Sequence, residues 1–147
     1  ENKSEKSQAS GEIPFYSEGE DLVFKVAENK IESIEGEGSQ AKKYKEYFEA
    51  DPARKNIAEL GLGCNEKAVR SGNVLEDEKV LGMHWAYGRS DHIGGTVGVS
   101  DFMDVKNVVH QDIVYPLGGE IGIRSLFVRY PDGRVVNIIK DNKYQIF

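Results

Sequence analysis

Residues 20–35 read EDLVFKVAENKIESIE and carry the clearest strand pattern of the chain. Leu22, Phe24 and Val26 recur at every second position, which is the period of a strand with one buried face. The polar step at residues 28–30 then interrupts the run, and apolar residues resume after it, so this step predicts a hairpin turn. The domain is therefore expected to begin with antiparallel strands.

The segments after this hairpin predict helices first and then further strands. Apolar residues recur at helical spacing over residues 39–56, where Ser39 is placed as an N-cap and Asp51-Pro52 starts a second short helix. We expect an α+β fold, a strand-rich mixed-sheet domain with one or two helices. Further strands are predicted over residues 58–63, 80–88, 108–115, 121–130 and 134–139, with a short helix over 75–79 and a turn at Pro131-Asp132-Gly133.

The composition indicates one ordinary domain and excludes several classes of function. The 147 residues carry 19 Lys and Arg against 25 Asp and Glu, a net charge of −6, which argues against nucleic-acid binding. No apolar run approaches the ~20 residues that span a bilayer, so no membrane partner is expected. The single cysteine, Cys64, excludes an internal disulfide framework and a cysteine-cluster zinc site. Because no signal peptide is visible, we expect a cytoplasmic protein.

The first ten residues, ENKSEKSQAS, are polar and charged and contain no apolar anchor. We expect residues 1–10 to be a flexible tail or a linker, and residues 11–147 to form a single domain. A chain that starts in a linker would be a piece of a longer protein.

His110-Gln111-Asp112 is the first candidate for chemistry. Residues i and i+2 of a strand project to the same face, so the imidazole and the carboxylate can converge on one cation. Apolar neighbours make the segment look buried or half-buried, and a buried aspartate needs a partner. The alternative is a His–Asp hydrogen bond that orients a core histidine.

His84 and Glu59 are the second and third candidates. His84 shares its predicted strand face with Ala86 and Gly88, which leave space for a ligand; the alternative is a histidine at the rim of the sheet. Glu59 lies within an apolar run, where a carboxylate rarely stays buried without a counter-charge or a metal ion. If residue 59 instead ends a helix, it is an ordinary exposed acid.

The remaining candidates carry weaker signals. Glu12 is weak on spacing alone, and His92, in a loop before Gly94-Gly95, is interpreted as part of a solvated face. The candidates together form a nitrogen and oxygen ligand set that zinc, cobalt or manganese accepts in hydrolytic sites. A carboxylate bridging two such ions would let one activate water while a carbonyl is polarised.

Several motifs, in order and at similar spacing over residues 10 to about 116, resemble one family. The chain is similar to the C-terminal, ligand-bearing part of the thermophilic metallo-aminopeptidases, the aminopeptidase T and aminopeptidase S type. The most specific motif is GNVLEDEKVLG at residues 72–82. The others are Ser10-Gly11-Glu12-Ile13, AELGLGCN at residues 58–65, HWAYG at 84–88, Gly94-Gly95 and His110-Gln111-Asp112.

The resemblance implies a function and a ligand set. Members of the family bind two divalent metal ions, usually zinc or cobalt, and remove N-terminal residues from peptides. By resemblance the metal ligands are Glu12, Glu59, His84, His110 and Asp112. A carboxylate outside this set, Glu76 or Glu78, would be the catalytic group that moves the proton. The expected partner is a peptide substrate, and a homodimer is left open.

Two alternatives follow from the same residues. His84, His110 and Asp112 also make a two-His-one-carboxylate set, which holds a single ferrous ion in dioxygenases. A mononuclear iron dioxygenase similar to this superfamily shows that the fold does not fix the reaction. The third interpretation is a non-catalytic domain that keeps the metal-binding site as a structural relic or as an element of a dimer.

Overall fold

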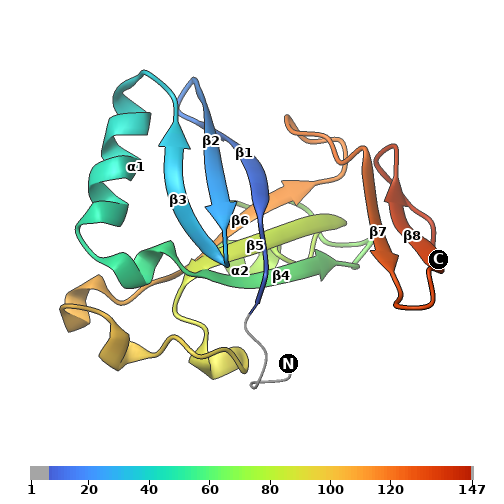
Figure 1. The fold of residues 1–147 in the computed structure, drawn as a ribbon. Coiled ribbons are helices and arrows are strands. Elements are labelled where there is room, and N and C mark those ends of the chain that lie inside the picture. The colour runs from blue at the N-terminus through green and yellow to red at the C-terminus, as the bar shows by residue number, and fades with distance from the viewer. Residues whose placement is uncertain (1–6, 147) are drawn as a thin grey trace. The chain divides into compact units, whose positions relative to one another are not determined.

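The computed structural model describes residues 7–146, in which nine strands form three small antiparallel sheets (Figure 1). The predicted fold class, a strand-rich α+β domain with one or two helices, is confirmed. Residues 1–6 of the predicted tail and the last residue lie outside the described part. Residues 7–10 are exposed and form no regular element.

The first sheet is a meander of β1 (Gly11–Ser17), β2 (Glu20–Ala27) and β3 (Lys30–Glu35). The predicted hairpin between β2 and β3 is confirmed, and its two turn residues, Glu28 and Asn29, both have positive φ. This conformation matches the right-handed twist of the flanking strands, so two-residue turns of this kind close hairpins well. A second two-residue turn, Glu18-Gly19, joins β1 to β2 and was not predicted from the sequence.

Helix α1 (Ser39–Glu49) follows the meander. The prediction of Ser39 as N-cap is wrong, because Gly38 holds that position and makes no side-chain cap. The Glu20 carboxylate of β2 replaces the cap: it accepts hydrogen bonds from Gln40 N and from Ser39 Oγ, each at 3.0 Å. A negative charge at the N-terminus of a helix also interacts favourably with the positive end of the helix dipole. The cap therefore comes from a strand and ties α1 to the meander.

An aromatic cluster forms the core beneath α1. The fully buried Phe24 ring of β2 lies 5.9 Å from the Phe48 ring and 5.7 Å from the Trp85 ring, both in edge-to-face geometry. Tyr44 packs at 5.8 Å from the same ring. Such pairs stabilise a core beyond the area that they bury. The residues around Trp85 are thereby fixed against the meander.

A second, short helix and a long loop position the residues discussed below. The second short helix predicted at Asp51-Pro52 is present as the 3-10 helix η1 (Pro52–Lys55). Asp51 has no exposed surface and accepts hydrogen bonds from Ala53 N, Met103 N and Asn107 Nδ2 at 3.1, 2.8 and 3.0 Å. It therefore fastens η1 to the loop of residues 89–109. Three further 3-10 turns lie in this loop: η2 (Asp91–Ile93), η3 (Val99–Asp101) and η4 (Val105–Asn107).

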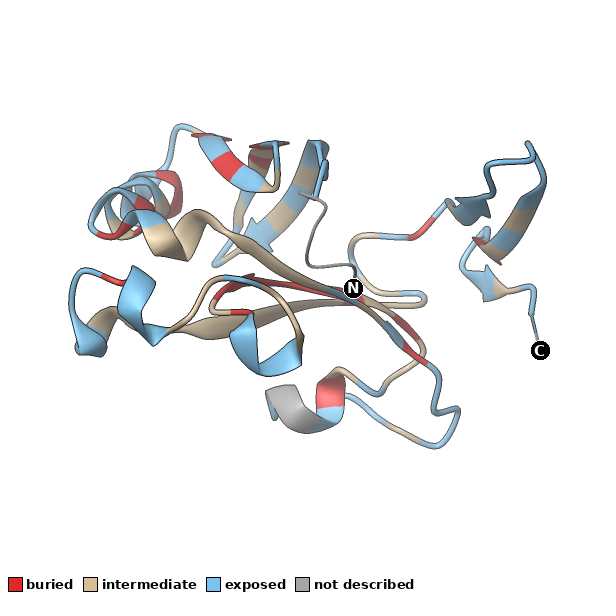
Figure 2. Cartoon of the chain, turned by 60° about the horizontal axis from the view of Figure 1, so that its bottom comes forward, coloured by how far each residue is buried: buried red, intermediate tan, exposed pale blue. Residues whose placement is uncertain are grey.

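The second sheet has the order β4-β5-β6. These strands confirm three of the predicted ones: β4 (Ile57–Gly63), β5 (Gly82–Gly88) and β6 (His110–Pro116). Strand β5 is buried along almost its whole length (Figure 2). The short helix α2 (Val74–Asp77) precedes β5 in the chain.

The third sheet consists of β7 (Ser125–Arg129), β8 (Val135–Lys140) and β9 (Lys143–Tyr144). Strands β7 and β8 are largely exposed (Figure 2). The predicted Pro131-Asp132-Gly133 turn between them is confirmed, with Gly133 at φ 87°. The Tyr144 hydroxyl lies 2.7 Å from both Gly63 O and Gly82 O, which anchors β9.

The chain divides into two compact units. Unit 1 contains the residues up to Glu59 together with Trp85–Asp112, and unit 2 contains Leu60–His84 and the chain from Ile113 onward. The strands β4, β5 and β6 each contribute residues to both units. In the described residues, no helix has the length and the apolar character needed to cross a bilayer.

Candidate metal centre

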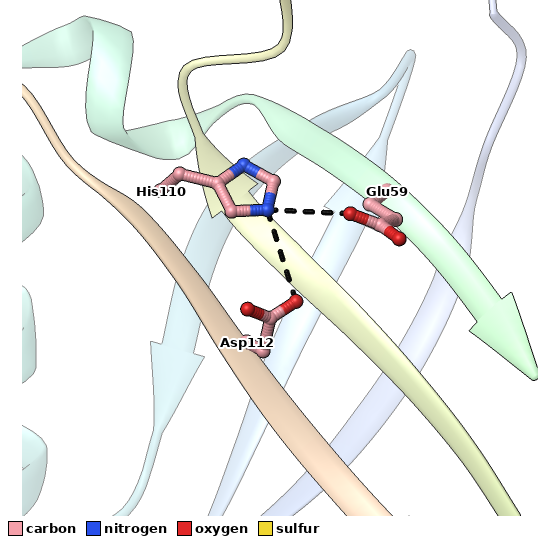
Figure 3. Close-up of side chains that lie close together, drawn as sticks. All are labelled: Glu59, His110 and Asp112. Atoms are coloured by element: carbon pink, nitrogen blue, oxygen red, sulfur yellow. Dashed lines mark ion pairs between the residues drawn. The ribbon is translucent and has the colours of Figure 1, made fainter. Parts of the chain in front are cut away.

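Three of the predicted ligands meet in unit 1. Glu59 lies on β4, and His110 and Asp112 lie two residues apart on β6. Figure 3 shows both carboxylates turned toward one ring nitrogen: His110 Nε2 lies 3.2 Å from Glu59 Oε2 and 3.8 Å from Asp112 Oδ1. One ligand atom from each residue lies within 4.8 Å of the other two, which is close enough for a shared cation. We call these three residues the triad.

A backbone carbonyl sets the orientation of the His110 ring. Nδ1 of His110 lies 2.7 Å from the carbonyl oxygen of Arg89, the residue that follows β5. Because a carbonyl only accepts hydrogen bonds, Nδ1 carries the proton, and in the neutral ring Nε2 offers its lone pair to the centre. Metal-binding histidines are held in this way by a partner on the other nitrogen.

Asp112 carries the clearest sign that the triad needs a cation. Its side chain is only 9% exposed, and among the described residues Oδ1 is buried without any hydrogen-bond partner. The His110 nitrogen at 3.8 Å is too far for a hydrogen bond. A buried carboxylate oxygen without a donor is costly, and a metal ion is one of the partners that removes the cost. One imidazole nitrogen and two carboxylates are also a donor set that zinc, cobalt and manganese accept.

Glu12 has a different partner in unit 1. Its side chain is 66% exposed on β1 and pairs with Lys25 Nζ at 2.5 Å. Lys25 also pairs with Glu35 at 3.3 Å, so one lysine links three neighbouring strands. Glu12 is in none of the groups of potential ligands found among residues 7–146, and its assignment as a metal ligand stays a prediction.

His84 lies on β5 in unit 2 and is buried. Gly61 of the same unit lies directly against the imidazole, since a Cβ atom at position 61 would overlap the ring atoms Nε2 and Cε1. The imidazole of His84 therefore occupies the space that the missing side chain of Gly61 leaves. A metal-binding role for His84 stays a prediction.

Of the two residues predicted to move the proton, Glu76 lies in α2 and Glu78 directly follows it, both in unit 2. Glu76 is exposed, and its Oε2 accepts a hydrogen bond from Ser71 Oγ at 2.7 Å. The neighbouring Asp77 is buried and accepts from Ser71 N and Gly72 N, so this acidic run fixes the preceding turn. Glu78 is half-buried. Their catalytic role stays a prediction.

His92 is exposed, which agrees with its interpretation as part of a solvated face. The sequence did not predict that its ring packs edge-on against His110, with ring centroids 4.7 Å apart and an interplanar angle of 86°. The one local signal for this placement is the Gly94-Gly95 pair, which predicts a turn but not its destination. The contact brings a second imidazole to the triad.

Comparisons with known proteins add no family assignment. No family model, no curated protein and no solved structure matched the chain. The similarity to the metallo-aminopeptidases therefore rests on the motifs quoted from the sequence.

Proposed function

We propose that the chain is a metal-dependent hydrolase domain of the aminopeptidase type, which removes N-terminal residues from peptides. The observation that carries the proposal is the buried Oδ1 atom of Asp112, which finds no hydrogen-bond donor within residues 7–146 and lies 3.8 Å from His110 Nε2. Glu59, His110 and Asp112 would hold a divalent ion. The substrate class is inferred from the sequence motifs. The same motifs are the basis for proposing a second ion, with His84 and Glu12 as further ligands.

Charge balance supports a cation at the triad. Two carboxylates and one neutral imidazole carry a charge of about −2, and the acidic side chains are 28% and 9% exposed, so water screens them only in part. A divalent ion cancels this charge and satisfies Oδ1 of Asp112 at the same time. A protonated histidine would neutralise only half of the charge.

The residues of the proposed site have separate roles. A divalent ion bound by such ligands lowers the pKa of a bound water and polarises the carbonyl that is attacked. The Arg89 carbonyl holds the ring of His110 so that Nε2 stays aimed at the centre. Glu76 and Glu78 are the candidates for a carboxylate outside the ligand set that would accept a proton from the attacking water.

Metal titration of the stripped protein tests the centre. The wild-type chain is expected to bind zinc or cobalt, whereas His110→Ala and Asp112→Asn bind at least about tenfold more weakly. Glu32→Gln is the matched control, because Glu32 is an exposed acid on β3 and its loss leaves the affinity unchanged. Unchanged metal affinity in both His110→Ala and Asp112→Asn contradicts the proposal, as does a wild-type chain that binds no metal.

Unfolding of the same variants gives an independent measurement. Without metal, Asp112→Asn is expected to be at least as stable as the wild type, because it removes a buried charge that lacks a donor. With metal, the wild type gains stability in proportion to the logarithm of the free metal concentration, and the variant gains much less. An equal gain in both proteins contradicts a role for Asp112 as a ligand.

An activity assay separates the three functions that the residues allow. A panel of aminoacyl substrates is compared with the same substrates carrying an acetylated N-terminus, and cleavage of the free amines alone supports the aminopeptidase proposal. Oxygen uptake that depends on added ferrous iron, without peptide cleavage, favours the dioxygenase. Metal binding without turnover in either assay favours the non-catalytic domain and contradicts the proposed reaction.

A further inference from the structure

The His92 imidazole lies beside the triad without belonging to it. Its ring makes an edge-on contact with the His110 ring, at 4.7 Å between centroids. Its nitrogens are not in the group of ligand atoms that lie within 4.8 Å of one another. His92 is therefore not counted as a fourth donor to the ion of the triad. A second ion ~3.5–4 Å from the first, sharing a carboxylate of the triad with it, would take its nitrogen ligand from outside the triad.

We propose that His92 is a nitrogen ligand of a second divalent ion, held next to the ion of the triad. The inference rests on the proposed function and extends it. Three protein donors already complete the usual set of an ion that keeps one open position. A further imidazole at the edge of that set is therefore available to a second ion.

The loop that carries His92 is fixed on both sides. Ser90 N and Asp91 N both donate hydrogen bonds to Val97 O, at 2.8 and 3.0 Å, and the buried Ser90 hydroxyl accepts one from Val97 N at 3.3 Å. Gly94 ends η2 at φ 101°, a conformation that other residues rarely adopt. Gly95 packs so closely that a Cβ atom there would overlap Ser90 Oγ. The position of His92 is thus built into the loop.

Arg89 connects the two histidines. Its carbonyl oxygen accepts from His110 Nδ1, and its guanidinium pairs with Asp91 at 2.5 Å. The Asp91 carboxylate in turn lies 3.8 Å from His92 Nδ1. Arg89 thus contacts His110 directly and the segment that carries His92 through Asp91.

The exposure of His92 agrees with this role. Its side chain is 39% exposed, so an ion from solution can reach it without rearrangement of the core. Packing against His110 needs only a flat ring, which phenylalanine also supplies. His92→Phe therefore removes the ring nitrogens that would bind the ion and keeps an aromatic ring that can pack against His110.

The test counts ions and measures both binding steps. Metal-stripped wild type, His92→Phe and His110→Ala are titrated with cobalt, and bound metal is followed by equilibrium dialysis and by visible absorption. We expect two ions per wild-type chain. His92→Phe should keep the first step, weaken the second at least about tenfold and change the absorption of the second ion. His110→Ala should weaken the first step, and His92→Ala repeats the measurement without the ring.

The outcomes separate this inference from the proposed function. Two ions bound by His92→Phe with wild-type constants and absorption overturn the inference and leave the triad intact, and so does a wild-type chain that saturates at one ion. A wild-type chain that binds no cobalt overturns both. Circular dichroism and thermal unfolding of each variant establish that the loss of binding is not a loss of fold.

Discussion

Removing the Asp51 carboxylate should strongly destabilise the fold, although this residue is not one of the proposed metal ligands. Asp51 has no exposed surface, and its two oxygens accept hydrogen bonds from Ala53 N, Met103 N and Asn107 Nδ2. Two of these donors lie 52 and 56 residues further along the chain. Asp51→Ala therefore leaves three donors without an acceptor and releases the loop that carries η4.

The magnitude follows from the number and kind of bonds. A hydrogen bond to a charged group contributes about 1.5–3 kcal/mol, so three independent bonds would give about 4.5–9 kcal/mol. The bonds share one carboxylate and are not independent, and we expect Asp51→Ala to lower the free energy of unfolding by about 3–5 kcal/mol. Asp51→Asn keeps one acceptor oxygen and should cost about 1.5–3 kcal/mol.

The pH dependence supplies a second, independent signature. Burial alone would raise the pKa of Asp51, but hydrogen bonds from Asn107, Met103 and Ala53 and the nearby Arg54 guanidinium hold this pKa below its ordinary value of 3.8. The folded state then binds fewer protons than the unfolded state as the pH falls past 3.8. The stabilisation by Asp51 is complete above that pH and is lost as the pH falls through the lowered pKa.

Urea unfolding followed by the fluorescence of Trp85, the single tryptophan, measures both effects. Asp104→Asn is the matched control, because Asp104 is an exposed acid in the same loop that accepts one local bond from Lys106 N at 2.8 Å. It should change the free energy of unfolding by less than about 1 kcal/mol. A loss below about 1 kcal/mol for Asp51→Ala at neutral pH would contradict a structural role for the three hydrogen bonds, as would an unchanged loss of stability at acid pH in Asp51→Asn.

Two further predictions concern unit 2. Gly61→Ala places a methyl group where the imidazole of His84 lies, so it should lower the free energy of unfolding by about 1–3 kcal/mol; an unchanged thermal midpoint would show that the site has room. Tyr144→Phe removes the single hydroxyl proton that the carbonyls of Gly63 and Gly82 share and should cost about 1–3 kcal/mol in urea unfolding at neutral pH. Burial and the neighbouring Cys64 raise the pKa of Tyr144 to about 12, and burial also raises the pKa of Tyr44 and of Tyr87. Ultraviolet titration of the wild type should therefore show one more late-ionising tyrosine than titration of Tyr144→Phe, and the wild type should lose more stability than the variant between about pH 10 and 12. A variant with the same titration curve as the wild type contradicts this assignment.

The features that the sequence predicted correctly depend on neighbours in the chain. The 28–30 hairpin needs only a short polar step between two alternating runs. The approach of His110 and Asp112 needs only a strand, on which residues two apart share a face. Such local rules also explain why the class of fold and the helix start at Pro52 were predicted.

The features that were missed depend on residues far apart in sequence. The N-terminus of α1 is capped by Glu20, which lies 20 positions before Gln40, so a rule that looks for a nearby serine selects the wrong residue. His92 reaches His110 because the 89–109 loop is pinned by Asp51 and by the Ser90–Val97 bonds. The spacing of residues in a loop does not indicate which distant residues hold the loop in place. The contact between His92 and His110 could therefore not be predicted from the sequence.

The alternation of the two units along the chain has a consequence for the order of assembly. Contacts within the β1–β3 meander are local in sequence, so this part closes only short loops as it forms. Glu59 and His110 both belong to unit 1, yet residues 60–84 between them belong to unit 2, and joining the two residues closes a loop of about 50 residues. During synthesis, Glu59 is made soon after the meander, but it can contact His110 and Asp112 only after residue 112 has been made. The triad therefore comes together only after residue 112 has joined the meander, and a bound metal ion would mark a chain whose unit 1 has assembled.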